Sequence, residues 1–518
     1  MKKLLLLMTV LLLTLQTKAQ SALVEDVISL RIQSTGYIIG SEGLAGYYSF
    51  YKFDKVNKSE NSFILLLHDN SLNLIKKITI NRPKNDKMVE IVYNGKNFLI
   101  AFLNKSDLEL VVYDKDGNKL GSRKQLKLSA ADRAALVSNS ESEEKNNITF
   151  GLGKTGFLKN DSHAGKKEKY RIEAFDNNLN NTWAYVSKYK GKAIEFVEVL
   201  AANEHVVALS VSRSKSRTSR DITMSLILLD AKTGNPLIEK ELKDGKAAKS
   251  LINAFVDTSS NEVVVGGEYY AAGENIVTGK PLGIYFERFS YFGESKGYQK
   301  LSWSRDFAKY QKSSKTGKAA DGGYTLFHKM FKTKNGDYVL IGEQFKSAVS
   351  AAGVAMNVAV LATGGGTTAG LVKFVIMDMV FVNLDSNFNL KAFERVEKNK
   401  REITLPKGWE FASSAMVAKY MKVNGLFDYA FSSVDFERNR VFASYVNYAK
   451  KKETEDKKKT NYVGTLVYDD GELTTDKLLL KSDATWYNIL PAKPGYIALM
   501  SYEKKAKTLE LRLEKINF

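Results

Sequence analysis

One pentapeptide matches the nucleophile motif of serine hydrolases. Residues 293–297 read GESKG, a literal GxSxG centred on Ser295, and Asp306 and His328 follow in the order that such hydrolases use. That motif requires the serine on a sharp turn between a buried strand and a helix. No helical pattern follows Ser295, and the pentapeptide lies between two segments that alternate like strands. The sequence therefore favours a hairpin turn here, and we assign no catalytic residue.

Two further motifs that suggest chemistry fail on their context. Residues 212–215 match the SxxK motif of acylases, but the same spacing also begins at Ser142, Ser187 and Ser501 in this serine- and lysine-rich chain. Residues 151–155 (GLGKT) resemble a phosphate-binding loop, yet Ile148 stands where that loop requires its first glycine. Neither motif supports an enzyme class.

The residue types that bind metals or form disulfides are scarce. The 518-residue chain has no cysteine and only four histidines, which lie far apart in the sequence. This excludes disulfides, thiolate metal sites and cysteine nucleophiles, and it also excludes an acylated lipoprotein cysteine. We predict no metal site and no cofactor. The 58 acidic residues could still pair in space, so a hydrolase that uses two carboxylates remains open.

The charge of the chain is strongly basic and comes mostly from lysine. The formal net charge is +19, and 62 of the 77 basic residues are lysines, which suit solvated surfaces better than bidentate phosphate binding. The densest cluster is the segment RSKSRTSR, and its candidate binding residues are Arg213, Lys215, Arg217 and Arg220. We predict contact with an envelope protein or with an acidic glycan or lipid surface, and not with nucleic acid. The alternative for the cluster is an exposed hairpin tip.

The N-terminus has the layout of a secretory signal peptide. Lys2 and Lys3 precede an apolar stretch over residues 4–15, and Thr17 and Ala19 then provide small residues at the −3 and −1 positions of a cleavage site. The stretch is too short to anchor the chain across a bilayer. We therefore expect residues 1–20 to be removed and the mature chain to be periplasmic or extracellular, without lipidation or a transmembrane span. The alternative is a buried N-terminal strand.

Beyond residue 20, short strand-like segments recur in a fixed order. The second strand of each repeat is rich in Val, Ala and Gly, as in SNEVVVGGEYY at 260–270 and NGDYVLIGEQF at 335–345. An acidic turn follows each third strand, where Asp accepts hydrogen bonds from backbone amides. These turns begin at Asp69, Asp114, Asp176, Asp230, Ser290, Asp385 and Asp469. Most are 45 to 62 residues apart, which is typical of propeller blades.

The pattern predicts an all-β propeller of seven or eight four-stranded blades, with eight slightly favoured and with a few short helical insertions. Seven repeats are complete, and an eighth at the C-terminus lacks its fourth strand. A strand over residues 24–32 is free to supply it, which would leave no exposed sheet edge. The alternative is two or three separate β-sandwiches or barrels. We expect one domain over residues 21–518.

Two insertions interrupt the repeats. The first, at 346–373, contains 26 uncharged residues with a triple glycine, so we expect a plug against the protein's own blades or, alternatively, a docking element. The second, at 401–425, includes a segment with helical spacing over 408–425. We expect this segment to pack beside the blades.

The chain resembles a family of uncharacterised, secreted, propeller-like bacterial proteins. The resemblance rests on KAQS at the end of the leader, on GYYSFYKFDK at 46–55, and on the Ala/Gly-rich insertion before FVIMDMVFVNLDSNFN. It implies a propeller fold, and it implies no activity and no site residue.

Two classes of function remain open. The first is a non-enzymatic binding scaffold of the cell envelope or exterior, which the failure of each local catalytic motif favours. The second is a propeller hydrolase or lyase that acts on glycan or peptide. Carboxylates that converge in one hollow, or Ser295 beside His328, would favour the second.

Overall fold

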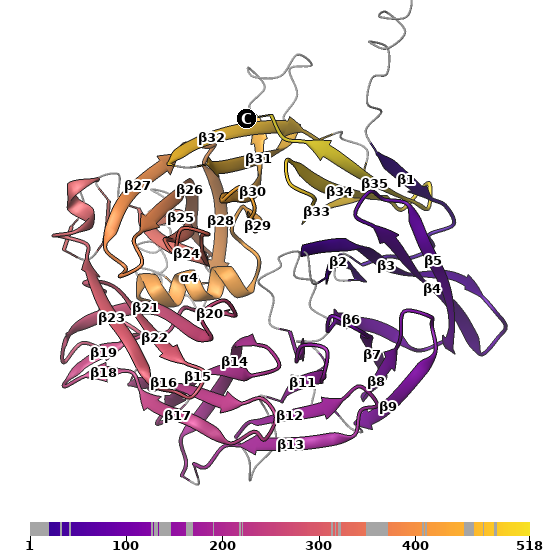
Figure 1. Ribbon diagram of the computed structural model, residues 1–518, viewed down its shortest axis with the longest axis horizontal. Helices are drawn as coiled ribbons and strands as arrows, with labels where there is room; N and C mark the ends of the chain where they lie inside the picture. The colour runs from indigo at the N-terminus through magenta and orange to yellow at the C-terminus, as the bar shows by residue number, and fades with distance from the viewer. Residues whose placement is uncertain are drawn as a thin grey trace, which may run out of the picture. The chain divides into compact units, whose positions relative to one another are not determined.

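Antiparallel strands joined by short turns make up most of the computed structural model (Figure 1). The sheets form an eight-bladed β-propeller, in which each blade has four main strands. The predicted all-β propeller is confirmed, with the larger of the two blade numbers. The structure describes residues 20–517 except 32–33, 41–42, 126–127, 129–132, 134–146, 162–168, 190, 217–218, 220, 312–313, 316, 320–322, 349–370, 407–408, 410–411, 450–459, 470 and 481–483.

The strands belong to two compact units. Unit 1 comprises residues 1–89 with 481–518, and unit 2 comprises residues 90–480. One blade of unit 1 contains β2 (Thr35–Gly40), β3 (Gly43–Lys55), β4 (Glu60–Asp69) and β5 (Leu74–Pro83). The other contains β33 (Trp486–Pro491), β34 (Tyr496–Glu503), β35 (Thr508–Lys515) and β1 (Ser21–Val24).

The N-terminal strand completes the C-terminal blade of unit 1, as predicted. Strand β1 pairs antiparallel with β35, with Ser21 opposite Arg512. The predicted bounds of 24–32 were wrong, because the pairing ends at Val24. Asp26 has a positive φ of 59° and turns the backbone away, and the amide of Ile28 then donates to the carbonyl of Lys52 on β3 at 3.0 Å.

The first three blades of unit 2 follow one another along the chain. The first contains β6 (Lys87–Tyr93), which spans the unit boundary, then β7 (Phe98–Asn104), β8 (Asp107–Tyr113) and β9 (Lys119–Gln125). The second contains β10 (Thr149–Gly151), β11 (Gly156–Asp161), β12 (Arg171–Asp176) and β13 (Asn181–Val186). The third contains β14 (Ile194–Ala202), β15 (Val206–Ser214), β16 (Ile222–Asp230) and β17 (Pro236–Glu241).

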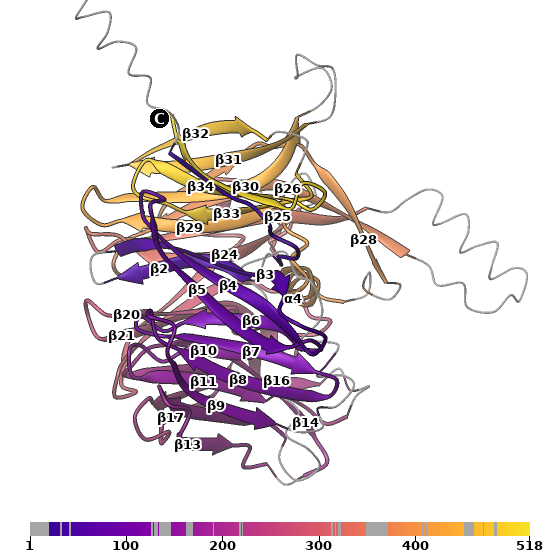
Figure 2. The same ribbon diagram turned by 90° about the vertical axis from the view of Figure 1, so that its right-hand side faces the viewer.

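The last three blades of unit 2 carry additions. The fourth contains β20 (Asn253–Asp257), β21 (Glu262–Ala272), β22 (Gly283–Ser290) and β23 (Ser295–Ser302), with β19 (Ala247–Lys249) paired to β21 and β18 (Lys243–Asp244) paired to β19. A 3₁₀ helix, η2 (Phe307–Lys309), precedes the fifth blade. That blade contains β24 (Tyr324–Lys332), β25 (Tyr338–Ala348), β26 (Leu371–Leu384) and β27 (Leu390–Val396), with β28 (Arg401–Pro406) paired to β26. The sixth contains β29 (Tyr429–Asp435), β30 (Arg440–Ala449), β31 (Thr460–Asp469) and β32 (Glu472–Leu479). Figure 2 shows β28 and the ends of β25 and β26 reaching beyond the neighbouring strands.

The acidic turns form where the sequence predicts them, and most share one hydrogen-bond pattern. In the turn at Asp176, Oδ1 accepts from the amides of Asn178 and Asn180, and the Asn180 side chain donates to Oδ2. The turns at Asp69, Asp114 and Asp385 repeat this arrangement. Burial acts to raise the pKa of Asp176, but these hydrogen bonds outweigh it and lower the pKa. Leu179 adopts a positive φ of 63° in this turn, and the residue is buried.

Apolar side chains from neighbouring blades pack face to face in unit 2. One hydrophobic cluster joins the second and third blades, for example through Ile172 and Val207, and another joins the third and fourth through Met224 and Tyr270. The first strands of successive blades also contact one another, namely β14 with β20, β20 with β24, and β24 with β29. The first strands of several blades therefore lie close together.

One α-helix, α4 (Ser414–Val423), lies beside β20 and β24 among the described residues (Figure 1). Ser413 caps the helix by accepting from the amide of Met416 at 3.2 Å. Val417 and Met421 face Phe345 and Phe374 in a buried cluster, so the apolar side of α4 packs on the fifth blade. Within the range 408–425, where the sequence has helical spacing, the structure thus has a helix over Ser414–Val423.

Two of the predicted segments fall largely outside the described residues. They are the signal peptide, of which only residue 20 is described, and the apolar insertion, of which residues 349–370 are not described. The insertion leaves β25 at Ala348 and returns at the start of β26. Its role as a plug or a docking element stays a prediction.

Candidate functional site

A cavity of about 240 Å³ lies beneath helix α4 in unit 2. Strands of the third, fourth and fifth blades form its walls, and one side of α4 closes it. Most of the lining side chains are apolar, among them Phe196, Met224, Leu326 and Phe345. A concave apolar hollow with a few polar groups is the usual form of a small-molecule site.

Hydrogen bonds and an ion pair attach α4 to three consecutive blades. At its N-terminal end the Ser413 hydroxyl donates to the carbonyl of Ile276 at 2.8 Å. Lys419 pairs with Glu198 on β14, with its Nζ 2.9 Å from Oε2. Lys422 donates to the Asn253 side chain on β20 at 3.2 Å and to the carbonyl of His328 on β24 at 3.4 Å. The helix that covers the cavity is therefore fixed in place on several sides.

Glu268 on β21 contributes a buried carboxyl group to the cavity wall. Glu268 is 6% exposed, and its Oε2 accepts a hydrogen bond from the hydroxyl of Tyr270 at 3.0 Å. The two side chains lie on one face of β21 because they are two residues apart. A Cβ at Gly267 would collide with the Ser250 carbonyl, and this close approach lets the Ser250 hydroxyl accept from the Glu268 amide at 3.1 Å.

Burial changes the acidity of Glu268. Desolvation raises the pKa of its carboxyl to about 7, and the hydrogen bond from Tyr270 offsets this only in part. The other ionisable groups on the cavity wall are Glu198, Lys419 and Lys422. Glu268 is therefore half protonated near neutral pH, inside an apolar hollow.

Glu343 occupies the matching position in the next blade. Glu268 follows Gly267 near the middle of β21, and Glu343 follows Gly342 in the same place on β25. Both side chains are buried, but their surroundings differ. Glu343 belongs to a network of charged residues rather than to the wall of the cavity.

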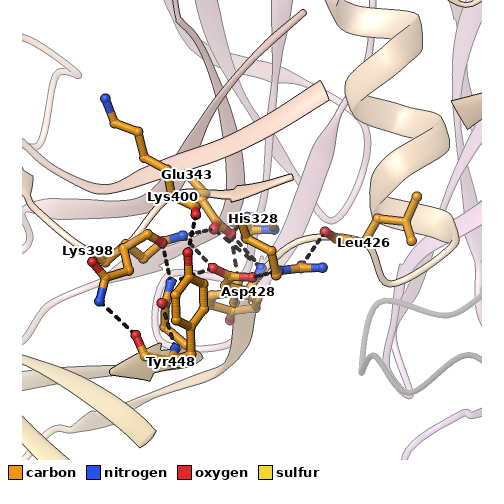
Figure 3. A network of polar contacts seen from close by, with 11 residues as sticks. His328, Glu343, Lys398, Lys400, Leu426, Asp428 and Tyr448 are labelled. Atoms are coloured by element: carbon orange, nitrogen blue, oxygen red, sulfur yellow. Dashed lines mark hydrogen bonds and ion pairs between the residues drawn. The ribbon is translucent and has the colours of Figure 1, made fainter. Parts of the chain in front are cut away.

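A buried cation lies between two carboxylates in this network (Figure 3). The Lys398 Nζ is 2.8 Å from Glu343 Oε1 and 2.5 Å from Asp428 Oδ2, and all three side chains are at most 2% exposed. Arg401 adds a second cation, with Nε 2.5 Å from Asp428 Oδ1. The backbone amides of Asp428 and Tyr429 donate to Glu343 as well. The cluster thus holds its charges in compensating pairs.

The electrostatic balance of the network follows from these contacts. Burial acts to raise the pKa of Glu343, but Lys398 and His328 outweigh it, so this pKa lies below its usual value. Burial and the charge of Glu343 together raise the pKa of Asp428. Burial acts to lower the pKa of Lys398, but the two carboxylates raise it above its usual value. Glu343 and Lys398 are therefore both charged at neutral pH.

The network also fixes the segment that follows α4. Arg401 donates to the carbonyl of Leu426 at 2.7 Å, and Asn447 donates to Asp428 Oδ2 at 2.8 Å. The His328 ring stacks on Tyr429, with ring centroids 4.5 Å apart. Because Leu426 lies three residues beyond the end of α4, these contacts set where the helix ends and hence where it covers the cavity.

The basic cluster is only partly described. Arg213 lies near the end of β15, with its guanidinium 2.7 Å from Glu195 Oε1 and over the ring of Tyr189. Lys215 is exposed and pairs with Asp221 at 2.5 Å. Arg217 and Arg220 lie outside the described residues. The charge of both described cations is thus locally balanced, and polyanion binding by this cluster stays a prediction.

The structure does not assemble the GxSxG residues into a triad. Ser295 begins β23, the last strand of its blade, directly after a hairpin turn at Gly293. Its hydroxyl donates to Glu287 at 3.3 Å, while Asp306 accepts from the amide of Ser302. His328 is buried on β24, the first strand of the next blade. The predicted hairpin turn is confirmed.

Sequence reasoning did not find Glu268, Glu343, Lys398 or Asp428.

Within the described ranges, no three His, Asp or Glu side chains come together as metal ligands. Nor does that part of the chain contain a helix with the length and apolarity that a membrane crossing requires.

Three solved structures illustrate what the fold is similar to. A quinohemoprotein alcohol dehydrogenase from Pseudomonas putida HK5 is 10% identical over 96% of this chain and 77% of its own, with a TM-score of 0.39. The tricorn protease is 8% identical over 90% and 36%, with a TM-score of 0.36. An uncharacterized protein from Listeria monocytogenes EGD-e is 10% identical over 72% and 86%, with a TM-score of 0.32. Likeness at this level carries no inference about activity.

No curated protein matches the chain in sequence. A family model does match, over residues 1–517. This match covers nearly the whole chain. It agrees with the family resemblance in the sequence, which implied a propeller fold. The chain belongs to DUF6770, a family of unknown function.

Proposed function

We propose that the chain is a non-enzymatic binding scaffold that holds a small, mostly apolar molecule in the cavity beneath α4. The cavity itself is the observation that carries the proposal, because it combines apolar walls with the buried carboxyl of Glu268. Such a combination provides binding energy through burial of the ligand and orientation through one polar contact. The attachment of α4 to three blades keeps this hollow preformed, which reduces the entropic cost of binding.

Filling the cavity is expected to abolish binding. Ala415 lines the cavity from α4, so Ala415→Trp places an indole ring in the space of the ligand. We expect 1-hexanol, a neutral probe, to bind the wild-type chain and to raise its melting temperature, and we expect both effects to disappear in Ala415→Trp. Isothermal titration calorimetry and thermal unfolding measure them.

Ala272→Trp is the matched control, because Ala272 is exposed at the end of β21 and does not line the cavity. This variant should bind 1-hexanol like the wild type. Equal binding by wild type and Ala415→Trp would refute the cavity as the binding site.

We further propose that the scaffold works outside the cytoplasm. The support is the signal-peptide layout of Lys2, Lys3, the apolar residues 4–15 and Ala19. N-terminal sequencing of the protein isolated from its native host should begin at Gln20 or Ser21. An intact Met1 would contradict export. Docking to an envelope protein or to an acidic glycan or lipid surface remains part of this proposal.

A glycan hydrolase is the second candidate, because one cavity contains two carboxyl groups in different surroundings. Glu198 is paired with Lys419, whereas Glu268 has its pKa raised by burial, which is the division of roles that a nucleophile and an acid require. The mostly apolar walls favour binding over glycan cleavage. Hydrolysis of a polysaccharide panel by wild type that falls by several orders of magnitude in Glu198→Gln and Glu268→Gln would establish the hydrolase instead.

A further inference from the structure

We infer that the ligand of this cavity is an amphipathic organic cation, an alkyl or aryl amine, whose ammonium group donates hydrogen bonds to Glu268. The inference rests on the proposed function, because it requires that the cavity bind a small molecule. It adds the chemical class of that molecule and names the group that selects it.

The first argument is the charge balance of the cavity wall. A buried carboxylate is costly unless a cation or several donors compensate it. Of the two lysines on the wall, Lys419 is paired with Glu198, and Lys422 donates to Asn253 and to a backbone carbonyl. The Glu268 carboxyl accepts from Tyr270, a neutral donor. A ligand ammonium would supply the positive charge that the ionised carboxyl requires.

The second argument is the comparison with the matching glutamate of the next blade. At Glu343 the chain itself supplies an ammonium group, the Lys398 Nζ at 2.8 Å, together with two backbone amides. At Glu268 the same strand position faces a cavity. The fold thus shows how it accommodates a charged glutamate at this position, and the ligand ammonium would play the part that Lys398 plays for Glu343.

The third argument concerns size and polarity. The cavity of about 240 Å³ exceeds the roughly 150 Å³ that accepts benzene in an engineered apolar site. Phe196, Met224 and Phe345 offer apolar contact to the hydrocarbon part of a ligand. A fatty acid of the same size would bring its carboxylate towards Glu268, and the repulsion between like charges disfavours it.

Three probes of equal chain length separate the inference from the proposed function. They are n-hexylamine, 1-hexanol and hexanoate, titrated into the full mature chain by calorimetry at pH 7.5. We expect hexylamine to bind about tenfold or more tightly than hexanol, as a charge-assisted hydrogen bond in a buried site allows. Hexanoate should bind more weakly than hexanol.

Glu268→Gln keeps the shape of the side chain and removes its charge. It should abolish the preference for hexylamine and leave the affinity for hexanol within a few-fold of wild type. Glu274→Gln is the matched control, because Glu274 is exposed shortly after β21 and does not line the cavity. It should keep the preference intact.

A readout on the wild type alone guards against misfolding of the variant. At pH 6 an incoming ammonium displaces the proton that Glu268 holds, so binding of hexylamine should release protons, and its heat should vary with the ionisation enthalpy of the buffer. Hexanol should show no such dependence. Hexanol binding without a preference for the amine, a preference that survives Glu268→Gln, or a preference for hexanoate would each overturn the inference alone. Binding of none of the probes would overturn the proposed function as well.

Discussion

Replacing Lys398 by methionine is expected to lower the free energy of unfolding by about 3–5 kcal/mol, the largest effect that the structure predicts for a single side chain. The change leaves Glu343 and Asp428 buried without the cation between them, and all three side chains are at most 2% exposed. Urea denaturation at pH 7 followed by circular dichroism measures the change.

The variant Lys400→Met serves as its control. Lys400 is exposed two residues away, so the same chemical change there should alter stability by less than about 0.5 kcal/mol. Adding Asp428→Asn to Lys398→Met should restore part of the loss, because it removes one of the two carboxylate charges that Lys398 balances and leaves Arg401 to balance the other. A loss below about 1 kcal/mol in Lys398→Met would show that the network does not hold its charges as described.

The second large effect is a pH dependence that Glu268 imposes on stability. Burial raises the pKa of its carboxyl to about 7 in the folded chain, against 4.5 when it is unperturbed. The folded state therefore holds a proton between these pH values that the unfolded chain has released. This proton stabilises the folded state, and the stabilisation is fully present below about pH 4.5. As the pH rises through about 7, the stabilisation is lost and the free energy of unfolding falls by about 3 kcal/mol.

The comparison with Glu268→Gln isolates this effect from other titrating groups. The amide stays neutral, so the stability of the variant relative to wild type should rise by about 3 kcal/mol between pH 4.5 and pH 8. Glu274→Gln, at an exposed position, should show no such trend. A difference between Glu268→Gln and wild type that is independent of pH would mean that the carboxyl is not desolvated in the folded chain.

The fold was predictable from the sequence because its determinants are local. The turns at Asp69 and Asp176 depend on hydrogen bonds to residues two and four positions ahead, so the sequence pattern alone reveals them. Strand alternation and the recurrence of these turns then limit the number of blades to seven or eight, and the structure has eight. The sequence predicted that an N-terminal strand would complete the last blade, but it did not predict where that strand ends. The end depends on a backbone turn at Asp26 that the apolar pattern does not show.

The candidate site was not predictable, because its residues meet only in space. Glu343, Lys398 and Asp428 are far apart in the sequence. A lysine or an aspartate by itself is too common in this chain to indicate a site. One signal was present in the sequence. Glu268 and Glu343 each follow a glycine at the end of an apolar run inside a strand, and an acid at such a buried position requires either a partner or a cavity.

A crystal structure of the mature chain with n-hexylamine tests the central claim most directly. The account predicts ligand density beneath α4, with the hydrocarbon against Phe196 and Phe345 and the nitrogen within hydrogen-bonding distance of Glu268. An amine bound elsewhere, or a cavity that contains only water under saturating amine, would contradict it.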